Sequence, residues 1–62
     1  MKKYTIETWC DGRWQLLIGV PQRFASRAAA EESLRFEAAN RRCRLVNGKG
    51  TTVLHAGVVR EQ

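Results

Sequence analysis

The sequence predicts a small α+β domain in which an antiparallel four-stranded sheet carries one helix on one face, in the order ββαββ. Aromatic and β-branched segments flank an Asp-Gly turn, an alanine-rich segment follows Ser26, and a second strand pair flanks residues 47–50. The 62 residues are expected to form a single domain, residues 1–62. At this length only about 60% of the unfolded chain's surface can be buried, so self-association would add useful stability.

The first two strands form a hairpin whose register depends on the length of its loop. A two-residue turn would pair Trp9 with Trp14 and mix polar and apolar residues on both faces. A three-residue loop over 10–12 instead pairs Ile6 with Leu16 and gives one apolar face, so we expect this second register. The residues then expected inside are Tyr4, Ile6, Trp14, Leu16 and Ile18, and those expected outside are Thr5, Glu7, Trp9, Arg13, Gln15 and Leu17.

The helix and the second hairpin follow from composition and turn residues. Ser26 is a good N-cap, and residues 27–40 contain no Gly or Pro, which predicts a helix of about four turns. Strands over 43–46 and 51–56 flank a glycine-rich turn, and residues 57–62 either extend the last strand or fray. Alternation places Cys43, Leu45, Leu54 and Ala56 inward, and Arg44, Val46, Val53 and His55 outward.

Apolar residues lie on two sides of the predicted helix. One stripe contains Ala30, Leu34 and Ala38, and the opposite side contains Ala29, Phe36, Ala39 and Cys43. Only one side can pack on the sheet. The side centred on Phe36 is therefore a candidate interface with a second copy of the chain or with another protein. The alternative is that Phe36 anchors the core and Leu34 lies at its edge.

A second candidate surface is the outer face of the sheet. In the expected register, Trp9 and Leu17 stand there among basic side chains, so the candidate binding residues are Trp9, Leu17, Lys3, Arg13 and Arg44. Aromatic rings between cations suit base stacking and phosphate contact, and they suit protein interfaces as well. Cross-strand packing that stabilises the sheet without any ligand remains a further possibility.

Composition and charge limit the classes of function. A net charge of +5 favours an acidic partner, although solubility alone also accounts for it. Two distant cysteines and one histidine do not match a structural metal site, and no pattern indicates a catalytic group, so we expect no metal, no cofactor and no enzyme. We expect reduced thiols in the cytoplasm, and the lack of an apolar run of about 20 residues predicts no membrane-spanning segment.

A tryptophan-containing hairpin, a Phe-x-Ser helix start and an Arg-rich exit into an Asn-Gly hairpin resemble many small bacterial and phage proteins. The resemblance implies a bacterial, phage or plasmid accessory protein, but it points to no family whose functional residues could be transferred. We therefore expect a non-catalytic interaction module, a homodimer through the Phe36 side or a sheet edge, that binds a protein partner. The alternative is a small basic nucleic-acid-binding protein that uses the outer sheet face.

Overall fold

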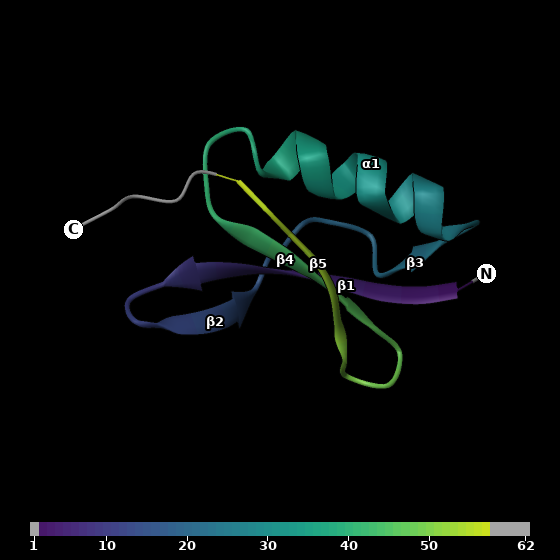
Figure 1. Ribbon diagram of the computed structural model, residues 1–62, viewed down its shortest axis with the longest axis horizontal. Helices are drawn as coiled ribbons and strands as arrows, with labels where there is room; N and C mark the ends of the chain where they lie inside the picture. Colours follow the sequence, from purple (N-terminus) through teal and green to yellow (C-terminus); the bar gives the residue numbers. More distant parts are fainter. Residues whose placement is uncertain (1, 58–62) are drawn as a thin grey trace.

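The computed structural model describes residues 2–57 and shows an antiparallel sheet with a single helix on one face (Figure 1). Its elements are β1 (Lys2–Cys10), β2 (Arg13–Leu16), β3 (Arg23–Phe24), α1 (Arg27–Glu37), β4 (Cys43–Asn47) and β5 (Thr52–Ala56). The strand order is β2-β1-β4-β5, and the two-residue β3 pairs with Lys2 and Lys3 of β1. The predicted α+β fold class is confirmed, with β3 as a short additional strand. Whether residues 58–62 extend the last strand or fray lies outside the described residues.

The first hairpin has the register that the sequence pattern disfavoured. Asp11 and Gly12 both have positive φ values, 54° and 79°, as a two-residue type I′ turn requires. Trp9 consequently pairs with Trp14. The expected three-residue loop is wrong because the backbone preference of Asp-Gly, together with the twist of the strands, outweighs the cleaner separation of polar and apolar side chains that the other register would give.

The orientation of β1 is as predicted, whereas that of β2 is reversed. Ile6 is buried against the helix, and Glu7 and Trp9 lie on the other face. Leu17 packs against the core instead of facing outward, and its backbone N–H donates to the Ile6 carbonyl at 3.0 Å. The residues wrongly expected inside are Trp14, which is half-buried on the open face, Leu16, which is 47% exposed, and Ile18, which is 90% exposed.

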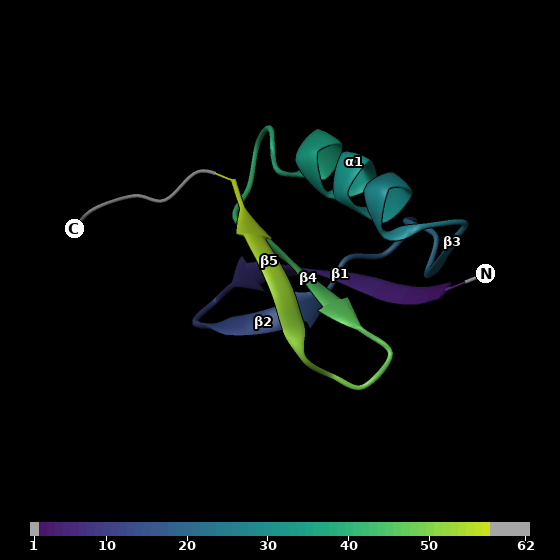
Figure 2. The same cartoon turned by 45° about the vertical axis from the view of Figure 1, so that its right-hand side comes forward.

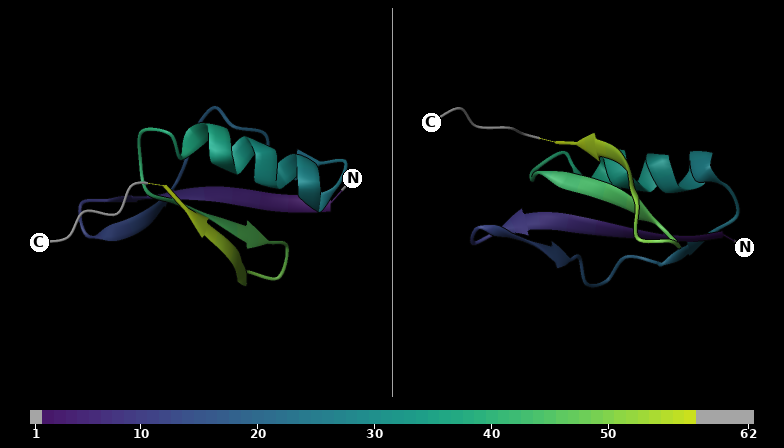
Figure 3. Two further views of the ribbon diagram at one scale, coloured as in Figure 1. Left: turned by 45° about the horizontal axis from the view of Figure 1, so that its top comes forward. Right: turned by 60° about the horizontal axis from the view of Figure 1, so that its bottom comes forward.

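The helix begins where the sequence predicts and ends three residues earlier. The Ser26 hydroxyl accepts the Ala29 N–H at 3.2 Å, which is the expected N-cap hydrogen bond. The helix ends at Glu37, because the chain needs residues 38–42 to cross from the helix layer to the start of β4. In both views of Figure 3, α1 lies on one side of the sheet.

The core lies between α1 and the central strands β1 and β4. Its buried residues are Ile6, Phe24, Ala30, Leu34, Ala38, Cys43 and Leu45. As predicted, Leu54 and Ala56 of β5 pack against it. Val53 also does so instead of facing outward, because a bulge interrupts the β4–β5 register between Leu45 and Val46. Val46, also predicted outward, is only 8% exposed.

Candidate functional site

The register of the first hairpin brings both tryptophans together on the sheet face that α1 does not cover. Trp9 and Trp14 are directly opposed, and their ring centroids lie 5.2 Å apart with an interplanar angle of 70°. This edge-to-face geometry is favourable for aromatic pairs. We call Trp9, Trp14, Arg42, Arg44 and His55 the tryptophan platform, because Arg42 lies near both rings and the other two side chains lie near Trp14.

Arg42 precedes β4 but is fixed to β1 through its carbonyl oxygen. That oxygen accepts hydrogen bonds from the backbone N–H of Trp9 and from the hydroxyl of Thr8, both at 3.0 Å. The Arg42 guanidinium carbon lies 5.5 Å from the ring centroids of both Trp9 and Trp14. These distances fall within the range of cation–π attraction. No carboxylate of residues 2–57 forms an ion pair with Arg42.

Arg44 lies on β4 and also contacts the Trp14 ring. Its guanidinium carbon is 4.5 Å from the Trp14 centroid. Both Nε and Nη2 donate to Oε1 of Glu7, at 2.7 Å and 2.6 Å, and both side chains are half-buried. Because Glu7 offsets the Arg44 charge, this pair mainly orients Trp14. Arg42 is left as the main uncompensated cation within the platform.

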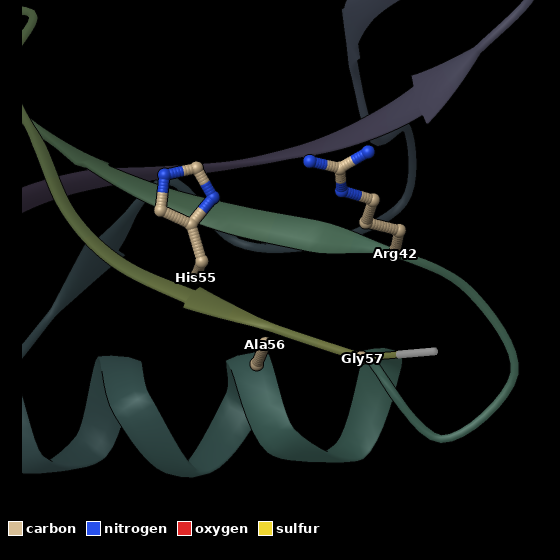
Figure 4. A pocket seen from close by; sticks show the side chains of 4 residues that line it. All are labelled: Arg42, His55, Ala56 and Gly57. Carbon is tan, nitrogen blue, oxygen red and sulfur yellow. The ribbon is translucent and has the colours of Figure 1, made fainter. Parts of the chain in front are cut away.

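His55 on β5 completes the platform. Its ring centroid lies 5.8 Å from that of Trp14, with a 56° angle between the planes. An open pocket of about 290 Å³ is lined by Arg42, His55, Ala56 and Gly57. Figure 4 shows the Arg42 and His55 side chains on the same side of the strands and Ala56 on the side of the helix. The pocket therefore adjoins the platform and offers one cationic and one imidazole group.

Gly57 fixes the position of this pocket. Its φ is +108°, and a Cβ there would overlap the Arg41 carbonyl oxygen and lie 2.9 Å from the Arg42 Cα. Such an approach is closer than side-chain carbons tolerate, so only glycine fits without displacing the backbone. The end of β5 is thus packed directly against the segment that carries Arg42.

Charge is distributed unevenly between the two layers. Residues 2–57 contain ten Lys and Arg and five Asp and Glu. The helix holds two of these cations and three of the carboxylates, a net charge of −1, so the remaining eight cations and two carboxylates give +6. An anion approaching the molecule is therefore attracted to the sheet and its loops rather than to the helix.

The structure separates the residues predicted for the outer-face surface. Trp9 and Arg44 lie in the platform, and Lys3 lies farther along the open face of β1. Leu17 and Arg13 do not belong to this surface, since Leu17 packs against the core and Arg13 pairs with Cys10 on the helix side of the sheet. Both corrections follow from the two-residue turn.

Sequence reasoning missed three members of the platform. The sequence pattern places Trp14 in the core, puts Arg42 in the Arg-rich segment after the helix, and puts His55 on the last strand with no link to the tryptophans. The Asp-Gly pair was the one signal that could have found Trp14, because a type I′ turn opposes the residues at positions 9 and 14. Only the pairing of β4 with β1 on one side and with β5 on the other brings Arg42 and His55 to the same place.

The proposed helix interface is also rearranged. Phe36 is 79% exposed, so the alternative in which it anchors the core is wrong, and Leu34 with 0% exposure packs on the sheet instead. Ala39 is exposed and Ala29 is partly buried against the core. Cys43 does not belong to this surface, because the helix ends before it and its side chain is fully buried in β4.

The cysteines and acidic groups form no recognisable reactive site within residues 2–57. Burial raises the pKa of the Cys43 thiol, partly opposed by a hydrogen bond with Thr8 and by the nearby Arg41, while Glu37 adds to the increase. Cys43 is thus kept in its thiol form. Cys10 is exposed, with its sulfur 3.7 Å from Oδ2 of Asp11. No group of three or more His, Cys, Asp or Glu side chains in this part of the chain could hold a metal ion.

No family model matches the chain, and no curated protein and no solved structure shows significant similarity to it. Among residues 2–57, no helix has the length and apolar character needed to span a membrane.

Proposed function

We propose that this protein is a non-catalytic binding module whose tryptophan platform binds single-stranded nucleic acid. The observation that carries the proposal is the Trp9–Trp14 pair beside two arginines on an uncovered sheet face. Proteins that bind single strands combine aromatic side chains, on which bases stack, with cations that contact the phosphates. Both components are present here within a few ångströms of each other.

The exposures and ion pairs suggest separate roles within the platform. Trp9 is 43% exposed and offers ring surface to a base. Trp14 is more enclosed and is held by Arg44, which Glu7 neutralises, so these residues support the platform. Arg42, which adjoins the open pocket, is the side chain best placed to contact a phosphate.

A single strand is favoured over a duplex because its bases are accessible for stacking. Bases inside a duplex already stack on one another, and exposing them costs a few kcal/mol. The uneven charge also favours an anionic polymer, since the net +6 lies outside the helix. We further propose a cytoplasmic location, which both free cysteines support.

Binding to fluorescent oligothymidylate and oligouridylate, measured by anisotropy at low salt, tests the proposal. Trp9→Ala should weaken binding about 5- to 150-fold, which corresponds to about 1–3 kcal/mol per stacked base. Trp9→Phe should retain most of the affinity because it keeps an aromatic face. Phe36→Ala is the matched control, since it removes an exposed ring on the helix layer and should leave affinity unchanged.

Salt dependence separates phosphate contact from stacking. Arg42→Ala should reduce the slope of log affinity against log salt by about 0.7. Arg35→Ala removes an exposed cation from the helix and should leave the slope unchanged. Absence of binding at tens of micromolar protein, or equal affinity for a duplex of the same length, would contradict the proposal.

A second candidate function is contact with a protein partner through the exposed side of the helix. The favouring observation is the 79% exposure of Phe36. Its neighbours one turn earlier on the helix are Glu32 and Ser33, and the helix ends one residue after it, so the apolar area is small. Loss of a co-purifying protein of defined mass with Phe36→Asp, but not with Trp9→Ala, would favour this candidate over nucleic-acid binding.

A further inference from the structure

The two edges of the sheet differ in how well they are protected against pairing with another chain. One edge is formed by β2 and β3, which are only four and two residues long. Arg13 and Arg23 lie on these strands, and Pro21 lies in the segment between them. Short strands, basic side chains and proline are the devices that natural sheets use to prevent edge-to-edge association. This edge is therefore protected.

The other edge, β5, lacks most of these devices. Its five residues contain no Lys, Arg, Asp, Glu or Pro. Figure 2 shows β5 beside β4, and in the right-hand view of Figure 3 it lies at the margin of the sheet, with β4 between it and β1. Within residues 2–57, β4 is the only strand that pairs with β5. The bulge affects its turn end, whereas Leu54, His55 and Ala56 pair regularly with β4. No other strand of residues 2–57 covers the outer side of this regular segment, so a further strand can pair there.

The small core gives a reason for such pairing. The largest fully buried side chains are Ile6, Leu34, Leu45 and Cys43, which is a small apolar core for a two-layer domain. Val53, Leu54 and Ala56 are only partly buried, although they pack against this core. A strand added beside β5 would cover them further and would satisfy the backbone groups at the edge.

We infer that β5 is the dimer interface of this protein, pairing antiparallel with β5 of a second copy about a twofold axis. A second copy is the occupant that fits best, because a strand without charged residues brings no like charges together when it pairs with itself. By contrast, β2 and β3 each carry an arginine that such pairing would bring near its own copy. The dimer would contain a continuous sheet in the order β2-β1-β4-β5-β5-β4-β1-β2. This pairing does not depend on what the platform binds.

The dimer would have a direct consequence for the platform. A twofold axis perpendicular to the sheet places both helices on one face and both tryptophan platforms on the other. His55 is the platform residue that lies on β5 itself, so the two copies of His55 would lie nearest the junction. If the platform binds single strands as proposed, one strand could cross both copies, and the length of strand bound per particle would double.

Sedimentation equilibrium on the full chain from micromolar to millimolar concentration tests the inference. Thr52→Lys adds a cation to β5 without touching the platform or the core cluster, and it should raise the dimer dissociation constant at least about tenfold, or about 1.4 kcal/mol. Gln15→Lys is the matched control, since it adds the same charge to β2 at the other edge and should leave the constant unchanged.

Amide hydrogen exchange identifies the interface directly. Protection of amides 52–56 should increase with protein concentration, while amides of β2 should not change. A wild-type protein that remains monomeric overturns the inference. A dimer that Phe36→Asp dissociates and Thr52→Lys does not would place the interface on the helix and would also overturn it. Neither result depends on whether oligonucleotides bind.

Discussion

Replacing Gly57 by alanine tests how the end of β5 fixes the segment that carries Arg42. Gly57 has a φ of +108°, a backbone conformation that costs a residue with a Cβ about 1–2 kcal/mol. The new Cβ would also overlap the Arg41 carbonyl oxygen, and relieving such a clash costs about 1–3 kcal/mol in packed sites. We therefore expect Gly57→Ala to lower the free energy of unfolding by about 2–5 kcal/mol, a large part of the roughly 3–9 kcal/mol expected for a domain of this size.

Gly50→Ala separates the two contributions. Gly50 also has a positive φ, +85°, but a Cβ there would have no atom within 4 Å. Gly50→Ala should therefore lower the free energy of unfolding only through its positive φ, by about 1–2 kcal/mol. Equilibrium urea unfolding followed by circular dichroism measures both variants. Equal losses for the two would refute the close approach between β5 and the Arg41 backbone. Gly57→Ala should also weaken oligonucleotide binding more than Gly50→Ala does, because the clash would displace Arg42.

Three further variants test the packing of the helix and the state of the buried thiol. Leu34→Ala should lower the free energy of unfolding by about 2–5 kcal/mol, whereas Phe36→Ala should change it by less than about 0.5 kcal/mol, as measured by urea unfolding. Because burial raises the pKa of Cys43 in the folded state, stability should be constant at lower pH and fall as pH rises above the ordinary cysteine value of about 8.5. Urea unfolding between neutral and alkaline pH should show a smaller fall in the free energy of unfolding for Cys43→Ala than for the wild type. Identical pH profiles for the two proteins would contradict a raised pKa for Cys43.

The elements that local chemistry determines could be predicted from the sequence. Ser26 caps the helix as expected because its hydroxyl satisfies a backbone N–H at the start of α1. The second hairpin forms around Asn47, whose side-chain oxygen accepts the N–H groups of Lys49 and Thr51 at 2.9 Å and 3.0 Å. Neither feature needs a distant contact, so residue type and spacing were sufficient.

The features that depend on tertiary contacts were harder to predict. The side of the helix that packs was left open, because the pattern allowed both Leu34 and Phe36. The register of β2 was misjudged by requiring one fully apolar face. This requirement does not apply to the edge strand β2, whose Leu16 is 47% exposed on the face that the helix does not cover. Arg42 reaches the platform because its carbonyl oxygen accepts hydrogen bonds from Thr8 and Trp9. These residues are far from Arg42 in the sequence, so no local pattern reveals the contact.

The two-residue turn at Asp11 and Gly12 has a consequence for how this protein can vary. Side chains alternate along a strand, so one residue inserted into the turn would exchange the two sides of β2. Gln15 and Leu17 would then lie on the open face, and Trp14 would be directed towards the helix layer and away from Trp9. Loop length at this position is therefore more constrained than the identity of most surface residues, and a single-codon insertion is the smallest genetic change that would dismantle the aromatic pair while retaining every residue that forms it.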